Sequence, residues 1–128
     1  MSIRLVIVDD HDLMRDGLRM TFEGTEVVIV AEAADGQQGL EALLAHSPNV
    51  ALVDISMPVA DGFYLLRNVQ TSNIPVPILM HSMHDGHARR CRELGAKGFV
   101  LKGQEKDVLL AAVRAVHAGQ EYWSLGNA

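Results

Sequence analysis

The chain begins with an apolar run, Ile3-Arg4-Leu5-Val6-Ile7-Val8, that leads directly into the acidic pair Asp9-Asp10. The run is rich in β-branched residues and is almost continuously apolar, so it does not show the alternation of a half-exposed strand. A strand that is buried on both faces of a parallel sheet has this composition. The stretch therefore predicts a buried parallel strand that ends at two carboxylates.

Similar runs recur at residues 27–31, 50–53, 76–80 and 98–101. Apolar residues at helical spacing lie between and after the runs, in four groups: Met14, Leu18 and Phe22; Leu40, Leu43 and Leu44; Leu65, Leu66 and Val69; and Leu109, Ala112, Val113 and Val116. A further helix, at about residues 87–94, has the weakest pattern. Strand and helix thus alternate five times, which predicts an α/β fold with right-handed crossovers and helices on both faces of the sheet.

Residues that commonly bound helices support this division of the chain. We expect aspartates as N-caps and glycines in left-handed conformation at helix ends: Asp35 (with Gln38 three positions later), Asp61, Asp85, Gly95 and Gly119. The helical pattern is lost after residue 118. We therefore expect one domain over residues 1–118 and a linker or tail over residues 119–128.

The composition restricts the class of protein. A chain of 128 residues is long enough for one core, and its formal charge of −5 argues against direct binding of nucleic acid. Its apolar runs are shorter than the roughly 20 residues that cross a bilayer. Met1 leads straight into the first strand, without the pattern of a signal peptide, and the single Cys91 cannot build a disulfide framework. We expect a cytoplasmic protein that does not contact a membrane.

Polar residues follow four of the five predicted strands. They are Asp9 and Asp10 after the first, Asp54 after the third, Ser82 after the fourth and Lys102 after the fifth. Only Ala33 and Ala34 follow the second, as expected if that strand lies at the outer edge. Because ligands bind beyond the carboxyl ends of the strands in open α/β sheets, we expect these side chains to converge there.

This set of side chains suits phosphoryl transfer. Three clustered carboxylates repel one another unless a cation compensates, and Mg²⁺ prefers such oxygen ligands. Asp54 could then attack phosphorus, as aspartate does in enzymes that form aspartyl phosphates. Lys102 would neutralise charge on the phosphoryl oxygens, and the hydroxyl of Ser82 could donate a hydrogen bond to one of them.

Three segments resemble the receiver domains of two-component response regulators. Residues 5–11 resemble the first strand and acidic pair of that family, residues 53–62 its phosphoacceptor loop with Met-Pro-x-x-Asp-Gly, and residues 95–102 its last strand and lysine. The resemblance implies a flavodoxin-like (βα)5 three-layer sandwich with strand order 2-1-3-4-5. It also implies that a sensor histidine kinase phosphorylates Asp54, and that the domain catalyses only its own phosphorylation and dephosphorylation.

The resemblance assigns further roles to individual residues. It places Mg²⁺ on Asp10, Asp54 and the backbone carbonyl of Ser56, with Asp9 in a supporting role. Ser82 and Phe99 would form the switch pair, in which the hydroxyl turns toward the phosphoryl group and the aromatic ring follows. On a buried strand, however, the default interpretation of Phe99 is that it is simply part of the core.

Lys102-Gly103 and the segment Ala118-Gly119-Gln120-Glu121-Tyr122-Trp123-Ser124 are most similar to the subfamily with a C-terminal helix-turn-helix (LuxR-type) domain. Such a protein would control transcription, contacting DNA through that domain, which is absent here. The chain is then either a fragment cut at the linker, which we favour, or a stand-alone receiver. The sequence leaves the kinase, the stimulus, the target genes and self-association on phosphorylation open.

Other interpretations are testable. Asp10-His11-Asp12 offers the Asp-x-Asp of haloacid-dehalogenase-like phosphohydrolases, although Met14 stands where that motif usually has Thr or Val. A receiver-like module that works without phosphorylation is a third alternative, weakened by the intact set of five site residues. A dinucleotide-binding fold does not fit, because the segment after the first strand has no glycine loop to hold a pyrophosphate.

Two features of the sequence stay outside this account. His84, His87 and Cys91 could hold zinc if one helix face carried all three. His81 stands at a strand position that is usually apolar, and the sequence offers no reason for it.

Overall fold

The computed structural model describes residues 2–124. Its centre is one parallel sheet of six strands in the order β2-β1-β3-β4-β5-β6. The strands are β1 (Ile3–Val8), β2 (Val27–Ala33), β3 (Val50–Asp54), β4 (Ile78–Ser82), β5 (Gly98–Leu101) and β6 (Tyr122–Ser124). The predicted order of the first five strands is confirmed.

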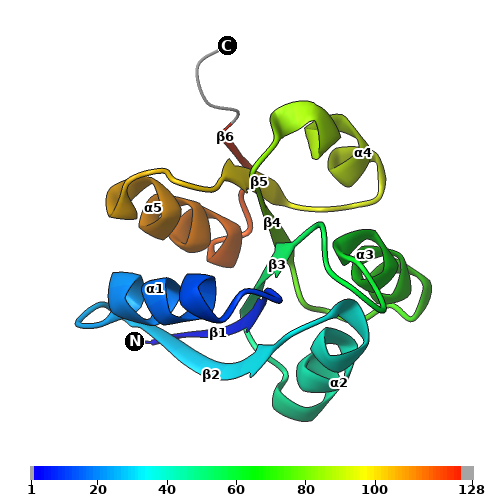
Figure 1. Ribbon diagram of the computed structural model, residues 1–128, viewed down its shortest axis with the longest axis horizontal. Coiled ribbons are helices and arrows are strands. Elements are labelled where there is room, and N and C mark those ends of the chain that lie inside the picture. The colour runs from blue at the N-terminus through cyan, green and yellow to red at the C-terminus, as the bar shows by residue number, and fades with distance from the viewer. Residues whose placement is uncertain (1, 125–128) are drawn as a thin grey trace.

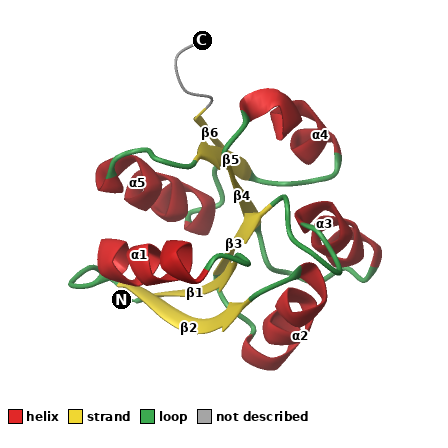
Figure 2. Cartoon of the chain, viewed as in Figure 1, coloured by secondary structure: helices red, strands yellow, loops and turns green. Residues whose placement is uncertain are grey.

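Helices cover both faces of the sheet, which completes the three layers (Figures 1 and 2). Helices α1 (Asp12–Phe22) and α5 (Lys106–His117) lie on one face. Helices α2 (Gly36–His46), α3 (Gly62–Thr71) and α4 (Ala88–Glu93) lie on the other, and a short 3-10 turn, η1 (Asp85–His87), precedes α4. The flavodoxin-like fold is therefore as predicted.

Each face of the sheet has its own hydrophobic core. On the α2–α3–α4 side, Val8, Val53, Met80 and Phe99 pack together, and on the α1–α5 side Ile7 packs with its neighbours from β3, β4 and β5. Successive side chains of a strand point to opposite faces, so one unbroken apolar run supplies both cores. This burial on two faces is what the continuous runs in the sequence predict.

Two of the three predicted N-caps are confirmed. Asp35 accepts a hydrogen bond from the backbone N–H of Gln38, and Asp61 accepts one from Tyr64, each at 2.9 Å. The prediction for Asp85 is wrong, because this residue is the first of η1, and α4 begins after His87 with no side-chain cap. A 3-10 turn carries the chain from β4 into α4, and it takes the place of the single cap that the sequence suggested.

β4 begins two residues later than the apolar run from Val76 predicts. Pro75 and Pro77 flank Val76, and proline has no N–H to donate to a ladder of hydrogen bonds. The strand also extends further than predicted and ends at Ser82 rather than at Met80. Ser82 is the last residue of the strand and lies at the carboxyl edge of the sheet, beside the other polar residues.

The sixth strand was not predicted, since residues 119–128 were interpreted as a linker or tail. Gly119 ends α5 in the left-handed region (φ 84°), and the chain then turns back along β5. The N–H of Tyr122 bonds to the carbonyl of Lys97 at 3.1 Å, which starts β6. A strand of three residues carries too little pattern to identify in the sequence. Residues 125–128 lie outside the described part of the chain.

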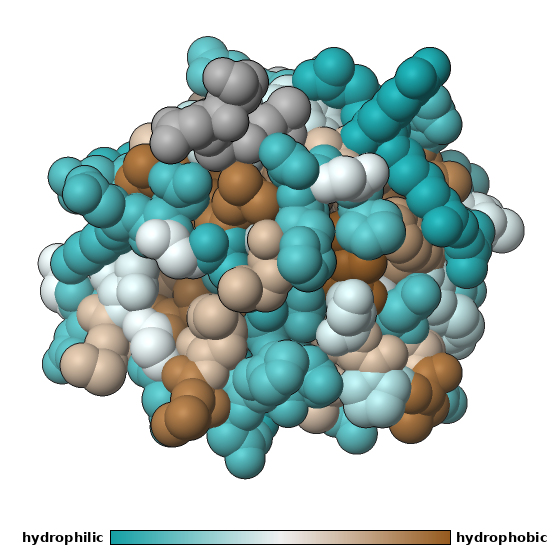
Figure 3. Space-filling view, turned by 45° about the horizontal axis from the view of Figure 1, so that its top comes forward, coloured by the Kyte–Doolittle hydropathy of each residue, from teal (hydrophilic) through white to brown (hydrophobic). Residues whose placement is uncertain are grey.

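The surface carries hydrophobic side chains in separate small groups among hydrophilic ones, as the face in Figure 3 shows. The most exposed large ones are spread over several elements, and two of them, Leu13 and Met20, belong to α1: Leu13, Met20, Val28, Leu44, Val59 and Met83. Within residues 2–124, none of the helices has the length and apolar character needed to cross a membrane.

Candidate functional site

All five polar residues predicted at strand ends meet at one edge of the sheet. Asp9 and Asp10 follow β1, Asp54 ends β3, Ser82 ends β4 and Lys102 follows β5. These four strands are neighbours in the sheet, so residues far apart in sequence become adjacent. β2, which is followed by no such residue, is the outer strand beyond β1, as expected.

Lys102 is the link between two of the carboxylates. Its ammonium donates a hydrogen bond of 2.9 Å to Asp9 Oδ2 and lies 3.3 Å from Asp54 Oδ2. The side chains of Lys102, Asp9 and Asp54 are only 4%, 3% and 6% exposed. A buried charge needs a partner of opposite charge. One lysine cannot balance two ionised carboxylates, so a net negative charge is left at this site.

Burial raises the pKa of the Asp54 carboxyl above its ordinary value, because a low-dielectric environment disfavours the charged form. The Lys102 ammonium acts in the opposite direction and lowers this pKa, while the Asp9 carboxylate raises it. A cation added beside Asp54 would therefore favour the ionised, nucleophilic form of this carboxyl.

Asp10 offers an acceptor that the described residues do not satisfy. Its Oδ1 is buried and accepts no hydrogen bond; His11 Nδ1 lies 3.1 Å away but without hydrogen-bond geometry. Ligand atoms of Asp9, Asp10, His11 and Asp54 all lie within 4.8 Å of one another. An unsatisfied carboxylate oxygen in a negatively charged cluster fits a hard cation such as Mg²⁺.

His11 was not among the predicted site residues. Its Nδ1 lies 3.3 Å from Asp9 Oδ1, and its ring is 68% exposed, at the rim of the cluster. Its backbone N–H also bonds to Asp9 Oδ1 at 2.9 Å. Its position directly after the acidic pair was the only signal in the sequence.

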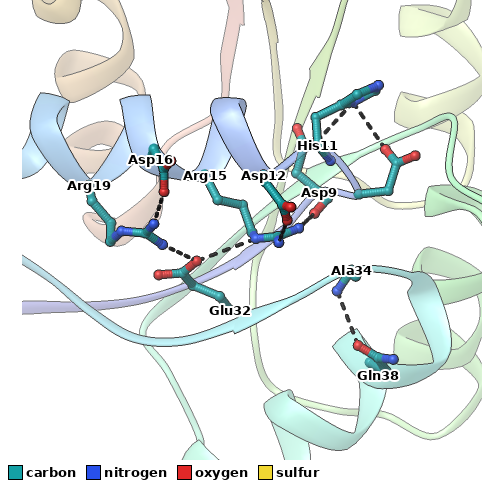
Figure 4. Close-up of polar contacts among 10 residues, drawn as sticks. Asp9, His11, Asp12, Arg15, Asp16, Arg19, Glu32, Ala34 and Gln38 are labelled. Carbon is teal, nitrogen blue, oxygen red and sulfur yellow. Dashed lines mark hydrogen bonds and ion pairs between the residues drawn. The ribbon is translucent and has the colours of Figure 1, made fainter.

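The backbone at Asp9 is held by α1. Arg15 donates a hydrogen bond to the carbonyl oxygen of Asp9 and pairs with Asp12, and its Nε lies 3.4 Å from Glu32 of β2. Arg19, one turn later, pairs with Asp16 and with the same Glu32 (Figure 4). This chain of ion pairs ties β1, β2 and α1 together immediately behind the acidic pair.

The loop after β3 is fixed by close backbone contacts. The N–H of Gly62 bonds to the carbonyl of Ile55 at 2.8 Å, and a Cβ at position 62 would lie 2.3 Å from the carbonyl oxygen of Asp54. Only glycine fits so close to the strand end. Ser56 is exposed in this loop and lines a hollow of about 510 Å³ that Asp10 also lines. The structure thus places Ser56 beside the acidic cluster.

Ser82 and Lys102 are joined through the backbone, because the N–H of Lys102 bonds to the carbonyl of Ser82 at 2.7 Å. The Ser82 side chain is buried, and its Oγ accepts a bond of 3.2 Å from the N–H of His84. The hydroxyl proton is therefore free to point to a new acceptor at the site. Phe99 is completely buried in the core beside Met80, where it serves packing in the described state.

His81 is buried next to Asp54 in the register of β3 and β4. Burial, together with the nearby Lys102 ammonium, lowers the pKa of its imidazole to about 4, while the Asp9 carboxylate opposes this shift. The ring is therefore neutral near pH 7. A neutral imidazole fills this buried position beside the charged pair without adding another cation.

The zinc hypothesis is not supported by the geometry. Of the residues that the structure describes, one group of His, Cys, Asp and Glu has ligand atoms close enough for a metal, and it is the acidic cluster. Cys91 is buried inside the α4 core, and burial raises the pKa of its thiol to about 11. His84 and His87, in contrast, are exposed to solvent.

Comparison with known proteins decides the family. The family model described as "Response regulator receiver domain" matches residues 5–114. The chain belongs to the response regulator receiver domain family.

Its similarity to curated relatives extends over nearly its whole length. The transcriptional regulatory protein DegU of Brevibacillus brevis is 34% identical over 124 residues, which are 94% of this chain and 52% of DegU. Response regulator UvrY of Escherichia coli (strain K12) is 31% identical over 94% of this chain and 56% of UvrY. The receiver domain thus spans little more than half the length of these relatives.

Solved structures show the same fold. A two-component response regulator of the LuxR family from Aurantimonas sp. SI85-9A1 superposes with a TM-score of 0.88 at 29% identity, covering 95% of this chain and 89% of that one. The isolated receiver domain of RcsB from Salmonella enterica serovar Typhimurium, in the presence of the phosphomimetic BeF3−, gives 0.85 at 25% identity, covering 97% and 94%. The receiver domain and its LuxR-family relatives therefore share the predicted architecture.

Proposed function

We propose that this receiver domain accepts a phosphoryl group on Asp54 and transmits the new charge to a regulated partner. The observation that supports this most strongly is the buried triangle of Asp9, Asp54 and Lys102, with contacts of 2.9 and 3.3 Å. It holds a carboxylate nucleophile and a fixed cation at one strand end. Phosphoryl transfer depends mainly on such positioning and on neutralisation of phosphoryl oxygens.

Mg²⁺ is the cofactor that these residues fit. Asp10, Asp54 and the backbone carbonyl of Ser56 would hold it, with Asp9 in a supporting, partly water-mediated role. The unsatisfied Oδ1 of Asp10 is the feature that supports this assignment. When bound, the ion would supply positive charge to the phosphoryl oxygens and favour the ionised form of Asp54.

The transfer itself involves two bonds. A carboxylate oxygen of Asp54 forms a bond to phosphorus while the bond from phosphorus to a nitrogen of a kinase phosphohistidine breaks. The leaving imidazole keeps the electron pair and takes up a proton, so its charge is balanced. Lys102 contacts the phosphoryl oxygens, and the reaction ends with an acyl phosphate on the domain, which makes it a stoichiometric acceptor and not an enzyme with a separate substrate.

The buried hydroxyl of Ser82 would then report the phosphoryl group. It now accepts a bond from His84 and keeps its proton for another acceptor. Rotation toward the phosphoryl group would leave space that the neighbouring β5 aromatic, Phe99, can enter. The result is a shift between two packings of β4, β5 and α4, driven by contacts that differ between them.

Control of transcription is the output that we propose for the natural protein. The relatives named above include a transcriptional regulatory protein of about twice the length of this chain. A LuxR-type DNA-binding domain after residue 128 would contact DNA, while this negatively charged domain would not. A sensor histidine kinase in the cytoplasm is the proposed donor, and self-association on phosphorylation would alter DNA binding.

Intact-mass measurement tests the chemistry. The domain is incubated with acetyl phosphate, with and without Mg²⁺, as wild type and as Asp54→Asn. One Mg²⁺-dependent phosphoryl adduct in the wild type, absent from the variant, is expected. An unmodified wild type would favour a module that works without phosphorylation, and release of phosphate over many turnovers would favour a phosphohydrolase.

A further inference from the structure

We infer that β6 is a strap that senses the state of Asp54 through Trp123, and that it loosens when the domain is phosphorylated. This inference rests on the proposed function, because it concerns how the phosphorylated state is transmitted. It assigns a role to a strand and to a cation–π contact that the phosphorylation site itself does not need.

β6 lies directly against the strand that carries Phe99. In the sheet register Met80 of β4 faces Phe99 of β5, and Phe99 faces Trp123 of β6. Trp123 is partly buried and packs on the core cluster that contains Phe99, on the α4 side of the sheet. A change in the packing of Phe99 therefore reaches Trp123 through one neighbouring strand.

The indole ring is also held from outside the sheet. The guanidinium of Arg92, on α4, lies over the Trp123 ring at 4.3 Å from its centroid. The Nε1 of Trp123 donates a 2.8 Å hydrogen bond to Glu121, which fixes the ring at the start of the strand. Trp123 thus joins β6 to both β5 and α4, the two elements that the proposed switch moves.

α4 is suited to movement. It has six residues, its N-terminus has no side-chain cap, and Ala88 and Cys91 are its only buried residues. Those two residues pack in the same cluster as Phe99. If Ser82 and Phe99 rearrange, α4 must repack, and the Arg92 guanidinium leaves its position over the ring. β6 then loses one of the contacts that hold it against β5 and α4.

Thermodynamic linkage makes the strap measurable. A contact present only in the unphosphorylated packing opposes phosphorylation, and removing it favours the other packing by the same factor. An exposed cation–π contact corresponds to about a two- to fivefold change in an equilibrium. Arg92→Ala is therefore expected to tighten binding of the phosphomimetic BeF3− by about two- to fivefold, measured by fluorine NMR in the presence of Mg²⁺.

Trp123 is the only tryptophan in the chain, so its fluorescence reports on β6 alone. On phosphorylation with acetyl phosphate, its emission maximum is expected to move to longer wavelength and acrylamide is expected to quench it more strongly. In Arg92→Ala, part of this change is present before phosphorylation. Arg89→Ala is the matched control, since Arg89 lies on the same helix and pairs with Glu93 at 3.2 Å, with a side chain 92% exposed.

The outcomes separate the inference from the proposed function. Intact mass on the same samples shows whether the phosphoryl group is present. An adduct with unchanged Trp123 emission and quenching would overturn the strap, and so would BeF3− affinity in Arg92→Ala that is equal to or weaker than that of Arg89→Ala. Absence of an adduct would instead overturn the phosphorylation of the domain.

Discussion

Lys102 Nζ donates a hydrogen bond of 2.9 Å to Asp9 Oδ2, although 93 positions separate the two residues. The contact forms because β5 and β1 both end at the same edge of the sheet. It leaves Lys102 only 3.3 Å from Asp54, so one ammonium serves two buried carboxylates. The charge that this arrangement lacks is the charge that a divalent cation would supply.

Removing the ammonium should cost stability and change the response to Mg²⁺. Lys102→Ala leaves Asp9 and Asp54 buried without their cation, and breaking such a pair typically costs about 3–5 kcal/mol of unfolding free energy. Urea denaturation measures the loss. Mg²⁺ should recover more stability in this variant than in the wild type, because the cluster is more negative. Phosphorylation should be slower, and the Trp123 response should be lost.

Lys97→Ala is the control for that experiment. Lys97 is exposed, and its substitution removes the same charge at a position away from the cluster. Its unfolding free energy and its response to Mg²⁺ should match the wild type. Normal signalling by Lys102→Ala would contradict the role assigned to Lys102.

Asp10→Asn should abolish the stabilisation of the domain by Mg²⁺. The substitution removes a charge and replaces one carboxylate oxygen, so the cluster loses a ligand of a cation that prefers anionic oxygen. A thermal melt with and without Mg²⁺ measures the effect. Asp12→Asn is the matched control, because Asp12 lies two residues further along the chain, in α1, and its side chain is 87% exposed. Equal Mg²⁺ shifts in both variants would show that Asp10 is not a ligand.

Gly62→Ala should destabilise the domain and slow phosphorylation. A Cβ at this position would lie 2.3 Å from the Asp54 carbonyl and 2.9 Å from Ile55 Cα, so the backbone that carries the nucleophile must move. Overpacking typically costs about 1–3 kcal/mol. Gly17→Ala, at an open position within α1, should instead stabilise by about 0.5–1 kcal/mol. Denaturant titration compares the two; a neutral Gly62→Ala would mean that the loop is adaptable.

His81 should make the domain sensitive to mild acid. Its pKa is about 4 when folded and ordinarily 6.5, so the unfolded chain binds more protons between these values and stability falls as the pH falls through this range. The loss is on the order of 2 kcal/mol between pH 7.5 and 5. His81→Leu should lack this part of the pH dependence while keeping that of the carboxylates. Parallel curves of unfolding free energy against pH for the two proteins would contradict the assignment.

The fold and most of the site could be predicted because they depend on strong local signals. Continuous apolar runs identified β1, β3 and β5, and each run ended next to a polar residue that the sheet then brought to one edge. The sequence therefore predicts that Asp54 and Lys102 lie close together. The roles of Ser56, Ser82 and Phe99 stay predictions, because they concern contacts with Mg²⁺ and a phosphoryl group rather than the packing of the fold.

Features that depend on tertiary contacts could not be predicted. β6 forms because Gly119 turns the chain back onto an open edge of β5, and its three residues have no pattern of their own. Asp85 carried the signal of a cap, yet the 3-10 turn before α4 made the cap unnecessary. His81 became intelligible only once its burial beside Asp54 and Lys102 was known.

The most direct test of the central claim locates the phosphoryl group on the chain. Borohydride reduces an acyl phosphate, but not a free carboxylate, to an alcohol, so a phosphorylated aspartate becomes homoserine. The domain is phosphorylated with acetyl phosphate and Mg²⁺, reduced, digested and sequenced by mass spectrometry. Homoserine at position 54, dependent on Mg²⁺ and on the phosphodonor, is the predicted result. Homoserine at Asp9 or Asp10 instead, or at none of the three, would contradict the account.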